Sequence, residues 1–291
     1  MKIGFIGLGI MGKPMAKNYI EAGHEVYLND INESAVQELV SLGGIKSTIE
    51  ELAKNAEYVI TSLPNGEIVK AVIYSGQDAL TTQPEVNTKY IIDTSSLTPN
   101  EALEIYKKLD GTGIKYFDAP VSGGEPLAIS GELSVMIGCD EDAIEDVKIV
   151  LDPIANSVIR VGDVGAGSVV KLANQIIVNT NISALSEAVI LAKTFDINLE
   201  EMFEAIRGGL AGSAVMEAKF PKMIEENYQP GGTININYKD LKNVTSTADT
   251  VNLTLPVVNM IKEIYKSEIA NNHGGNDHSG VIKYFENINN M

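Results

Sequence analysis

Short apolar runs rich in β-branched and aromatic residues recur through the first half of the chain. They predict strands at Lys2–Ile6, Glu25–Asn29, Tyr58–Leu63, Tyr90–Asp93, Lys115–Phe117, Leu133–Ile137 and Val158–Val161. Between several of them the apolar residues follow helical spacing, as in Met11–Ala22, Ser34–Ser41 and Pro99–Leu109. This alternation of strand and helix is typical of an α/β fold with a doubly wound parallel sheet.

The pattern changes after Gly162. The glycines of Gly165-Ala-Gly167 open a run to about Phe195 without further glycine or proline, which predicts one long helix. Shorter helices are predicted at Leu199–Arg207, Ala214–Glu226, Tyr238–Asn252 and Pro256–Ala270. We therefore expect two domains, residues 1–162 around the sheet and all-α residues 163–291, joined by the long helix. A cleft between two domains is the default place for an active site.

Composition narrows the class of protein. Of the residues, 44% are hydrophobic and 21% are charged, the balance of a soluble globular protein. The net charge of −17 repels phosphate groups, so neither nucleic acid nor a membrane is an expected partner. Cys139 is the only cysteine and His24, His273 and His278 lack metal-ligand spacing, so we expect a cytoplasmic protein without a metal.

A glycine-rich motif follows the first predicted strand and opens the first helix. It consists of Gly7, Leu8, Gly9, Ile10, Met11 and Gly12 and has the G-x-G-x-x-G form of a dinucleotide-binding turn. The first sheet is therefore predicted to be Rossmann-type. Asp30 ends the second strand, where a carboxylate accepts hydrogen bonds from the adenosine ribose and repels a 2′-phosphate. NAD is the predicted cofactor, and Lys13 nearby leaves NADP open.

Four blocks together resemble the β-hydroxyacid dehydrogenase family, whose members include 3-hydroxyisobutyrate dehydrogenases. They are F-I-G-L-G-I-M-G-K-P-M-A-K-N-Y at Phe5–Tyr19, D-A-P-V-S-G-G-E-P-L-A-I-S-G at Asp118–Gly131, Gly165–Gln175, and Y-K-D-L at Tyr238–Leu241. The resemblance implies a catalytic lysine at Lys171. It also implies substrate contacts at Ser122, Gly123, Gly124, Asn174, Gln175 and Asp240, and cofactor contacts at Leu63, Pro64, Ser96 and Lys239.

The residues of these blocks suit that chemistry. Lys171, Asn174 and Gln175 have i, i+3 and i+4 spacing, so they project from one face of the long helix. A desolvated lysine can protonate the oxygen that hydride transfer leaves on an aldehyde. Backbone N–H groups exposed by Gly123 and Gly124, with the hydroxyl of Ser122, can hold a carboxylate.

Finer features indicate a substrate. K-L-A-N-Q at Lys171–Gln175, R-G-G-L-A-G-S at Arg207–Ser213 and D-H-S at Asp277–Ser279 are similar to family members that reduce tartronate semialdehyde to D-glycerate. Gln175 stands where many relatives have asparagine. The expected substrate is thus a small aldehyde or hydroxyacid that bears a carboxylate. We also expect a homodimer or homotetramer that forms through the helical domain. Two alternatives stay open: another β-hydroxyacid, such as 3-hydroxyisobutyrate or 2-(hydroxymethyl)glutarate, and an NAD-binding sensor without catalysis.

Overall fold

The computed structural model describes residues 1–291 and divides into two compact units, Met1–Lys171 and Leu172–Met291. The boundary falls inside a long helix, α8 (Ala166–Thr194), which begins in the first unit and continues through the second. The last strand of the sheet ends at Gly162. A functional boundary at residue 162 stays a prediction.

One sheet runs through the first unit. Its strands are β1 (Lys2–Ile6), β2 (Glu25–Asn29), β3 (Ile45–Lys46), β4 (Tyr58–Thr61), β5 (Tyr90–Asp93), β6 (Lys115–Asp118), β7 (Val121–Ser122), β8 (Leu133–Gly138) and β9 (Ala155–Gly162). They lie in the order β3-β2-β1-β4-β5-β6-β8-β7, with β9 beside β8. Strand order reverses between β1 and β4, and such a switch point is where α/β sheets bind ligands.

The parallel pairing that the sequence predicts extends from β3 to β6. It does not extend to β8, which is antiparallel to both β6 and β7. The link between β6 and β8 contains the short strand β7 and the helix α6 (Gly124–Ser130). The chain therefore reverses its direction at this edge of the sheet before it enters β8. Strand β9 then returns parallel to β8.

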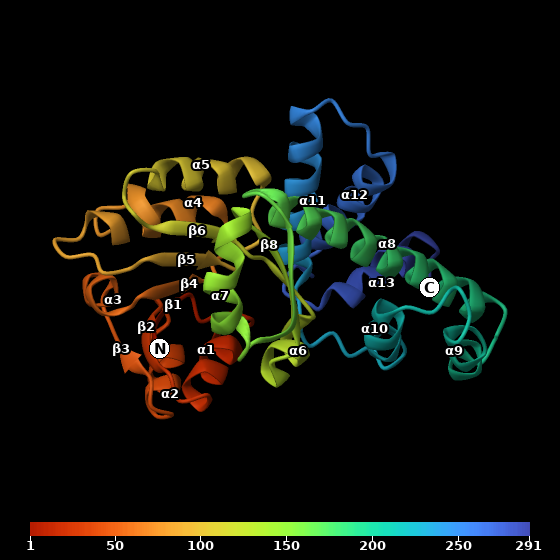
Figure 1. Cartoon of the computed structure of the whole chain (residues 1–291). Helices are drawn as coiled ribbons and strands as arrows, with labels where there is room; N and C mark the ends of the chain where they lie inside the picture. The colour runs from red at the N-terminus through yellow and green to blue at the C-terminus, as the bar shows by residue number, and fades with distance from the viewer. The chain divides into compact units, whose positions relative to one another are not determined.

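Helices cover both faces of this sheet (Figure 1). Side chains of α1 (Gly12–Glu21), α2 (Glu33–Val40), α6 and α7 (Ile144–Leu151) share one buried cluster with Phe5, Ile60 and Phe117. Those of α3 (Ile49–Asn55), α4 (Gly66–Lys70), the π-helical turn Ala71–Ser75 and α5 (Pro99–Leu109) share the other with Ile6 and Val59. Neighbouring strand residues thus point to opposite faces, and the central strands β1, β4 and β5 are mostly apolar because both faces are buried there.

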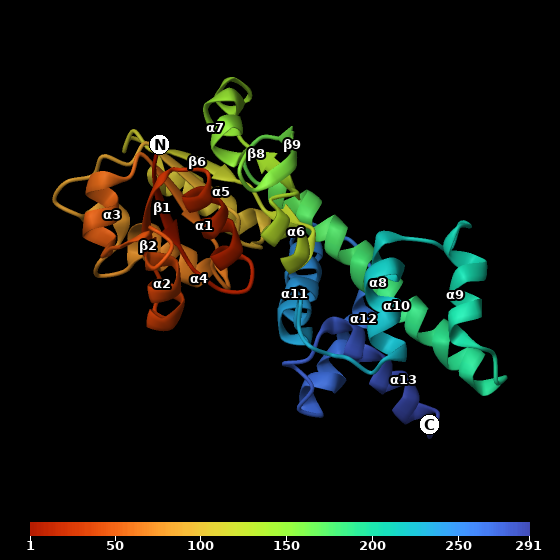
Figure 2. The same ribbon diagram turned by 90° about the horizontal axis from the view of Figure 1, so that it is seen from below.

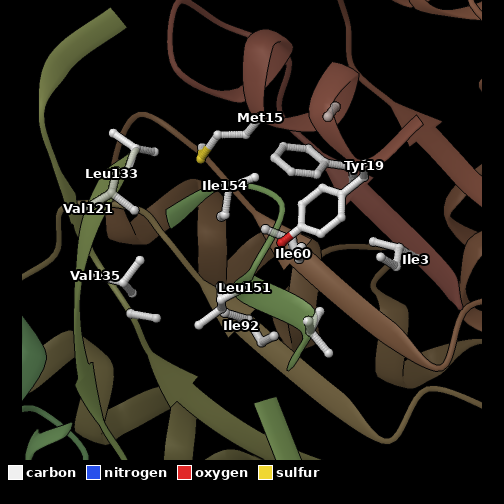
Figure 3. Close-up of a cluster of buried hydrophobic side chains, with 14 of the residues drawn as sticks. Ile3, Met15, Tyr19, Ile60, Ile92, Val121, Leu133, Val135, Leu151 and Ile154 are labelled. Carbon is white, nitrogen blue, oxygen red and sulfur yellow. The ribbon is translucent and has the colours of Figure 1, made fainter. Parts of the chain in front are cut away.

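Figure 3 shows the first cluster, in which Tyr19 and Met15 of α1 pack toward Ile60 and Ile154. Two helices of the opposite face start with capping boxes, at Thr48 with Glu51 and at Thr98 with Glu101. In each, the threonine hydroxyl accepts a backbone N–H while the glutamate reaches back, which fixes where the helix begins. Sequence patterns predicted α5 with its correct bounds and did not predict α3, α4, α6 or α7.

The second unit is helical, as the sequence predicts. It consists of α8 from Leu172, α9 (Leu199–Arg207), α10 (Ala214–Ile224), α11 (Ile234–Thr250), α12 (Pro256–Ala270) and α13 (Ile282–Ile288), with a 3-10 turn at His278–Val281 (Figure 2). The core joins Ile182 and Val189 of α8 to Phe220, Leu241 and Tyr265. Helix α8 is long and apolar enough to cross a membrane, as the core helices of globular proteins often are. Half of its most apolar stretch is buried inside the protein.

Candidate active site

The turn after β1 has the shape that a dinucleotide requires. Gly7 has a φ of +98°, and a Cβ there would lie 2.2 Å from the carbonyl oxygen of Ser62. A Cβ at Gly12 would lie 2.0 Å from the carbonyl oxygen of Gly7, so this glycine lets α1 start against the strand. A Cβ at Gly9 would meet no atom within 4 Å, which leaves open space over the N-terminus of α1. These three features fit a pyrophosphate held by backbone N–H groups.

Asp30 is tied to this turn. Its Oδ2 accepts a hydrogen bond from the backbone N–H of Leu8, and its Oδ1 accepts one from Asn32 at 2.6 Å. The carboxylate is therefore held at the end of β2 beside the glycine motif. Each of its oxygens has a second lone pair that can accept a ribose hydroxyl. Asn32, and not Asp30, caps α2.

Two side chains bear on how a 2′-phosphate could be bound beside Asp30. Ile31 follows directly and is fully exposed. Lys13, which directly follows the glycine motif, forms an ion pair with Glu38 at 3.0 Å. A cation already balanced by a carboxylate is a weaker partner for a phosphate.

The loops after β4 and β5 are bonded to each other. The backbone N–H of Leu63 donates to Oγ of Ser95 at 2.9 Å, and the N–H of Ser95 donates to Oδ1 of Asp93 at 3.0 Å. Pro64 is exposed and Ser96 is half-buried. The three predicted nicotinamide contacts, Leu63, Pro64 and Ser96, thus lie at the carboxyl ends of adjacent strands.

Asp93, the last residue of β5, holds these loops through its carboxylate. It is buried and also accepts hydrogen bonds from the hydroxyls of Thr61 at 2.8 Å and Tyr116 at 3.0 Å. Burial raises the pKa of its carboxyl, although these hydrogen bonds oppose the shift. The sequence analysis missed Asp93 because a strand ending in aspartate has no distinctive local signal.

The segment after β6 contains the three residues that are predicted to hold a carboxylate. Ser122 is half-buried at the end of β7, and Gly123 and Gly124 have φ values of +139° and +69°. A Cβ at Gly123 would lie 2.8 Å from the Cβ of Leu127 in the following helix. Only glycine can adopt this backbone at such a close approach, and the turn exposes Gly123.

Lys171 is anchored to the same segment. Its Nζ donates a hydrogen bond to the carbonyl oxygen of Val121 at 2.9 Å, and its side chain is half-buried. Val121 is the residue before Ser122. The predicted catalytic ammonium group and the predicted carboxylate cradle are therefore brought together within the first unit.

Asp118 fixes the start of the helix that carries Lys171. Its two carboxylate oxygens accept backbone N–H groups of Gly165 at 2.9 Å and Ser168 at 2.8 Å. A Cβ on Gly138 would lie 2.1 Å from Asp118 Oδ1, and one on Gly167 would lie 2.5 Å from its carbonyl oxygen, so both glycines make room for it. Burial raises the pKa of Asp118 to about 7, against the effect of these hydrogen bonds. The sequence analysis did not predict that Asp118 holds the start of α8. The only available signal was its position as the first residue of the D-A-P-V-S-G-G block.

The remaining predicted residues form a network within the helical unit. Asn174 Nδ2 donates to Gln175 Oε1 at 3.0 Å, and Gln175 Nε2 donates to Asp240 Oδ2 at 2.6 Å. Lys239 Nζ lies 2.9 Å from Asp240 Oδ1. Asn174 and Lys239 are half-buried, whereas Gln175 and Asp240 are buried.

The D-H-S stretch has a structural part in the same unit. Asp277 is fully buried and forms an ion pair with Lys219 of α10 at 3.0 Å. It also accepts the backbone N–H groups of Gly231 and Ser279, both at 3.0 Å. This carboxylate therefore joins α10, the loop before α11 and the 3-10 turn. Neither unit contains a group of three or more His, Cys, Asp or Glu side chains suited to a metal ion.

Comparison with known proteins gives the family. Residues 2–162 match the NAD-binding domain of 6-phosphogluconate dehydrogenase, and residues 165–285 match the NAD-binding domain of NADP-dependent 3-hydroxyisobutyrate dehydrogenase. The chain is 36% identical to 2-hydroxy-3-oxopropionate reductase of Escherichia coli, covering 98% of this chain and 97% of that one. It is also 36% identical to 2-(hydroxymethyl)glutarate dehydrogenase of Eubacterium barkeri, covering 98% and 95%.

A solved structure agrees with the sequence comparisons. The 3-hydroxyisobutyrate dehydrogenase of Salmonella typhimurium superimposes with a TM-score of 0.86 at 30% identity, covering 97% of this chain and 98% of that one. The two family matches together span nearly the whole chain, and their order is that of the two predicted domains. The chain therefore belongs to the 3-hydroxyisobutyrate dehydrogenase-like family of β-hydroxyacid dehydrogenases.

Proposed function

We propose that this protein reduces tartronate semialdehyde to D-glycerate with NADH, and catalyses the reverse oxidation, with Lys171 as the general acid and base. The observation that carries the proposal is the hydrogen bond from Lys171 Nζ to the carbonyl oxygen of Val121, next to the cradle that begins at Ser122. The similarity to 2-hydroxy-3-oxopropionate reductase supports this substrate.

The cofactor would lie along the carboxyl edge of the sheet. Its pyrophosphate would be held by the Gly7–Gly12 turn, its ribose by Asp30, and its nicotinamide by Leu63, Pro64 and Ser96, with Lys239 as a further contact. The exposed Ile31 and the pairing of Lys13 with Glu38 support NAD over NADP. When bound, the nicotinamide supplies the hydride for reduction.

Lys171 would provide the proton. Hydride addition to an aldehyde leaves an oxyanion, and an ammonium group beside it both stabilises the charge and donates a proton. An ammonium has three N–H donors, so it can hold a backbone carbonyl and bind a substrate oxygen at the same time. The bond to Val121 therefore orients the acid without preventing its use.

The substrate carboxylate would bind to Ser122, Gly123 and Gly124, and Asn174 would bind its hydroxyl. Fixing both ends brings the carbonyl carbon into a near-attack position. Lys171 and Lys239 are the cations among the proposed residues, and Lys239 is paired with Asp240 at 2.9 Å. A substrate with a single carboxylate suits this charge balance better than a dicarboxylate.

A second candidate is oxidation of a larger β-hydroxyacid, for which 2-(hydroxymethyl)glutarate is the specific case. The equal identity to the dehydrogenase of that compound favours it. A further alternative is an NAD-binding protein without catalysis. Retention of Lys171 with its anchor and of the glycine cradle argues against that alternative.

We further propose a division of labour and an assembly. Residues 1–162 would bind the cofactor, and residues 163–291 would complete the substrate site and support a homodimer or homotetramer. The protein would act in the cytoplasm on small carboxylate-bearing aldehydes and hydroxyacids, without nucleic acid, membrane or metal. Gel filtration with light scattering tests the assembly.

The proposed activity is tested by NADH oxidation with tartronate semialdehyde, methylmalonate semialdehyde and succinate semialdehyde at equal concentration, and by NAD reduction with 2-(hydroxymethyl)glutarate. We expect kcat/KM to be at least about tenfold higher for tartronate semialdehyde, which corresponds to about 1.4 kcal/mol. Preference for another substrate would overturn the substrate assignment, and NADH binding without turnover on any of them would favour the sensor.

A further inference from the structure

We propose that Gln175 is a positioning residue of this active site, which holds Asn174 and the Lys239–Asp240 pair in one arrangement instead of binding the substrate itself. The inference rests on the proposed function, because that function gives Asn174 and Lys239 their roles. It revises the part assigned to Gln175 from the sequence, which was a direct contact with the substrate.

The side chain of Gln175 lies at the centre of a continuous polar relay. Its Oε1 accepts a hydrogen bond from Nδ2 of Asn174 at 3.0 Å. Its Nε2 donates to Oδ2 of Asp240 at 2.6 Å and to Oδ1 of Asn237 at 3.3 Å. The other oxygen of Asp240 lies 2.9 Å from Lys239 Nζ. One amide therefore connects Asn174 of α8 to two residues of α11 directly, and to Lys239 through Asp240.

Burial separates the members of the relay into two kinds. Gln175 is 6% exposed, Asp240 is 2% exposed and Asn237 is 4% exposed. The two ends, Asn174 and Lys239, are only half-buried. The ends can reach a ligand, whereas the middle has little surface to offer one. A buried amide whose donor and acceptor are both used is suited to fixing the orientation of its neighbours.

The length of the glutamine side chain is essential to the relay. Asparagine would withdraw the amide from Asp240 by one carbon–carbon bond, about 1.5 Å. A contact of 2.6 Å would then exceed the range of a hydrogen bond, and a buried carboxylate oxygen would lose a donor. Asn174 would also lose the acceptor that sets which way its amide faces. Glutamine at this position thus couples the orientation of Asn174 to the position of Lys239.

The relay predicts that Gln175 acts on both ligands. In Gln175→Asn, KM for tartronate semialdehyde should rise about tenfold through Asn174, and the Kd of NADH should rise about threefold through Lys239. Gln175→Glu keeps the length but brings a carboxylate toward Asp240, so it should weaken both ligands at least as much. Ser183→Ala is the matched control. It removes a buried hydrogen bond of 3.0 Å from the same helix, outside the relay, and should leave both constants within about twofold.

Double-variant cycles distinguish positioning from direct contact. KM is measured for Asn174→Ala with and without Gln175→Asn, and the Kd of NADH by fluorescence for Lys239→Ala with and without it. If Gln175 acts through its neighbours, its substitution should have little further effect in either background. Full additivity in both cycles, or unchanged constants in Gln175→Asn, would overturn the proposal. The NADH cycle needs no turnover, so it still decides the role of Gln175 if the wild type reduces none of the semialdehydes and the proposed function fails.

Discussion

The ammonium nitrogen of Lys171 lies 2.9 Å from the carbonyl oxygen of Val121, and this hydrogen bond joins α8 to strand β7, next to the predicted carboxylate cradle. The segment that contains β7 begins at Asp118, the last residue of β6, whose carboxylate holds the first turn of α8. The helix is thus fixed twice to one segment of seven residues, Asp118–Gly124, once by its backbone and once by Lys171. Under the proposed function, this double attachment would pre-organise Lys171 as the general acid for proton transfer.

Lys171→Ala should reduce kcat by about 10³-fold, because it removes the proposed general acid, while the Kd of NADH should change little. The measurement is steady-state turnover together with NADH fluorescence titration. Lys266→Ala, which removes an exposed lysine paired with Glu263, is the control and should retain full activity. Substantial turnover by Lys171→Ala would refute its catalytic role.

Replacing Asp30 should change the choice of cofactor. In Asp30→Ala the discrimination against NADPH should fall roughly tenfold, since the carboxylate no longer binds the ribose or repels a 2′-phosphate. In Glu38→Ala, Lys13 loses its ion-pair partner, so NADPH should bind more tightly while NADH is unaffected. The ratio of kcat/KM for the two cofactors measures both effects. An unchanged ratio in Asp30→Ala would refute the proposed contact between Asp30 and the ribose.

Asp118 should make stability depend on pH near neutrality. Burial raises its folded-state pKa to about 7 from an ordinary value of 3.8, so the folded state binds a proton that the unfolded state has already released. Its contribution to the free energy of unfolding should therefore fall as the pH rises from about 4 to about 7. Urea unfolding of the wild type and Asp118→Asn across this interval should show a smaller slope in the variant. Equal slopes would contradict the assignment.

Asp277 should act in the opposite direction at acid pH. Although burial opposes the shift, the charges of His278 and Lys219 and two backbone hydrogen bonds lower its pKa to about 2. Its contribution should be complete above pH 3.8 and should be lost as the pH falls toward about 2.

Asp277→Asn should cost about 3 kcal/mol near neutral pH, because it leaves the largely buried Lys219 without its counter-charge. Glu263→Gln, which breaks an exposed pair with Lys266, should cost no more than about 0.5 kcal/mol. Chemical denaturation at pH 7 and at pH 3 compares the two variants. A loss for Asp277→Asn no larger than that for Glu263→Gln would show that the buried pair contributes little.

Much of the fold could be predicted from local patterns. The bounds of β1, β2 and α5 agree with those expected, because strand and helix periodicities are carried by residues close together in the chain. The glycine turn was equally local, since Gly7 and Gly12 act within one strand–helix connection. The short helices α3 and α4 were not predicted, because five to seven residues carry too little periodicity.

The sequence by itself determined the alternation of the main strands and helices in the first half, the helical second half, the dinucleotide turn and the family-like motifs that single out Lys171. Tertiary structure alone decided that β8 runs antiparallel, that Asp118 holds the start of α8, and that Gln175 is buried against Asp240. The last two features depend on hydrogen bonds between residues far apart in the sequence. Asp118 and Gly165 are 47 positions apart, and Gln175 and Asp240 are 65 positions apart. Local patterns report which face of an element is apolar, whereas the partner of a buried polar group is fixed only when distant elements pack together.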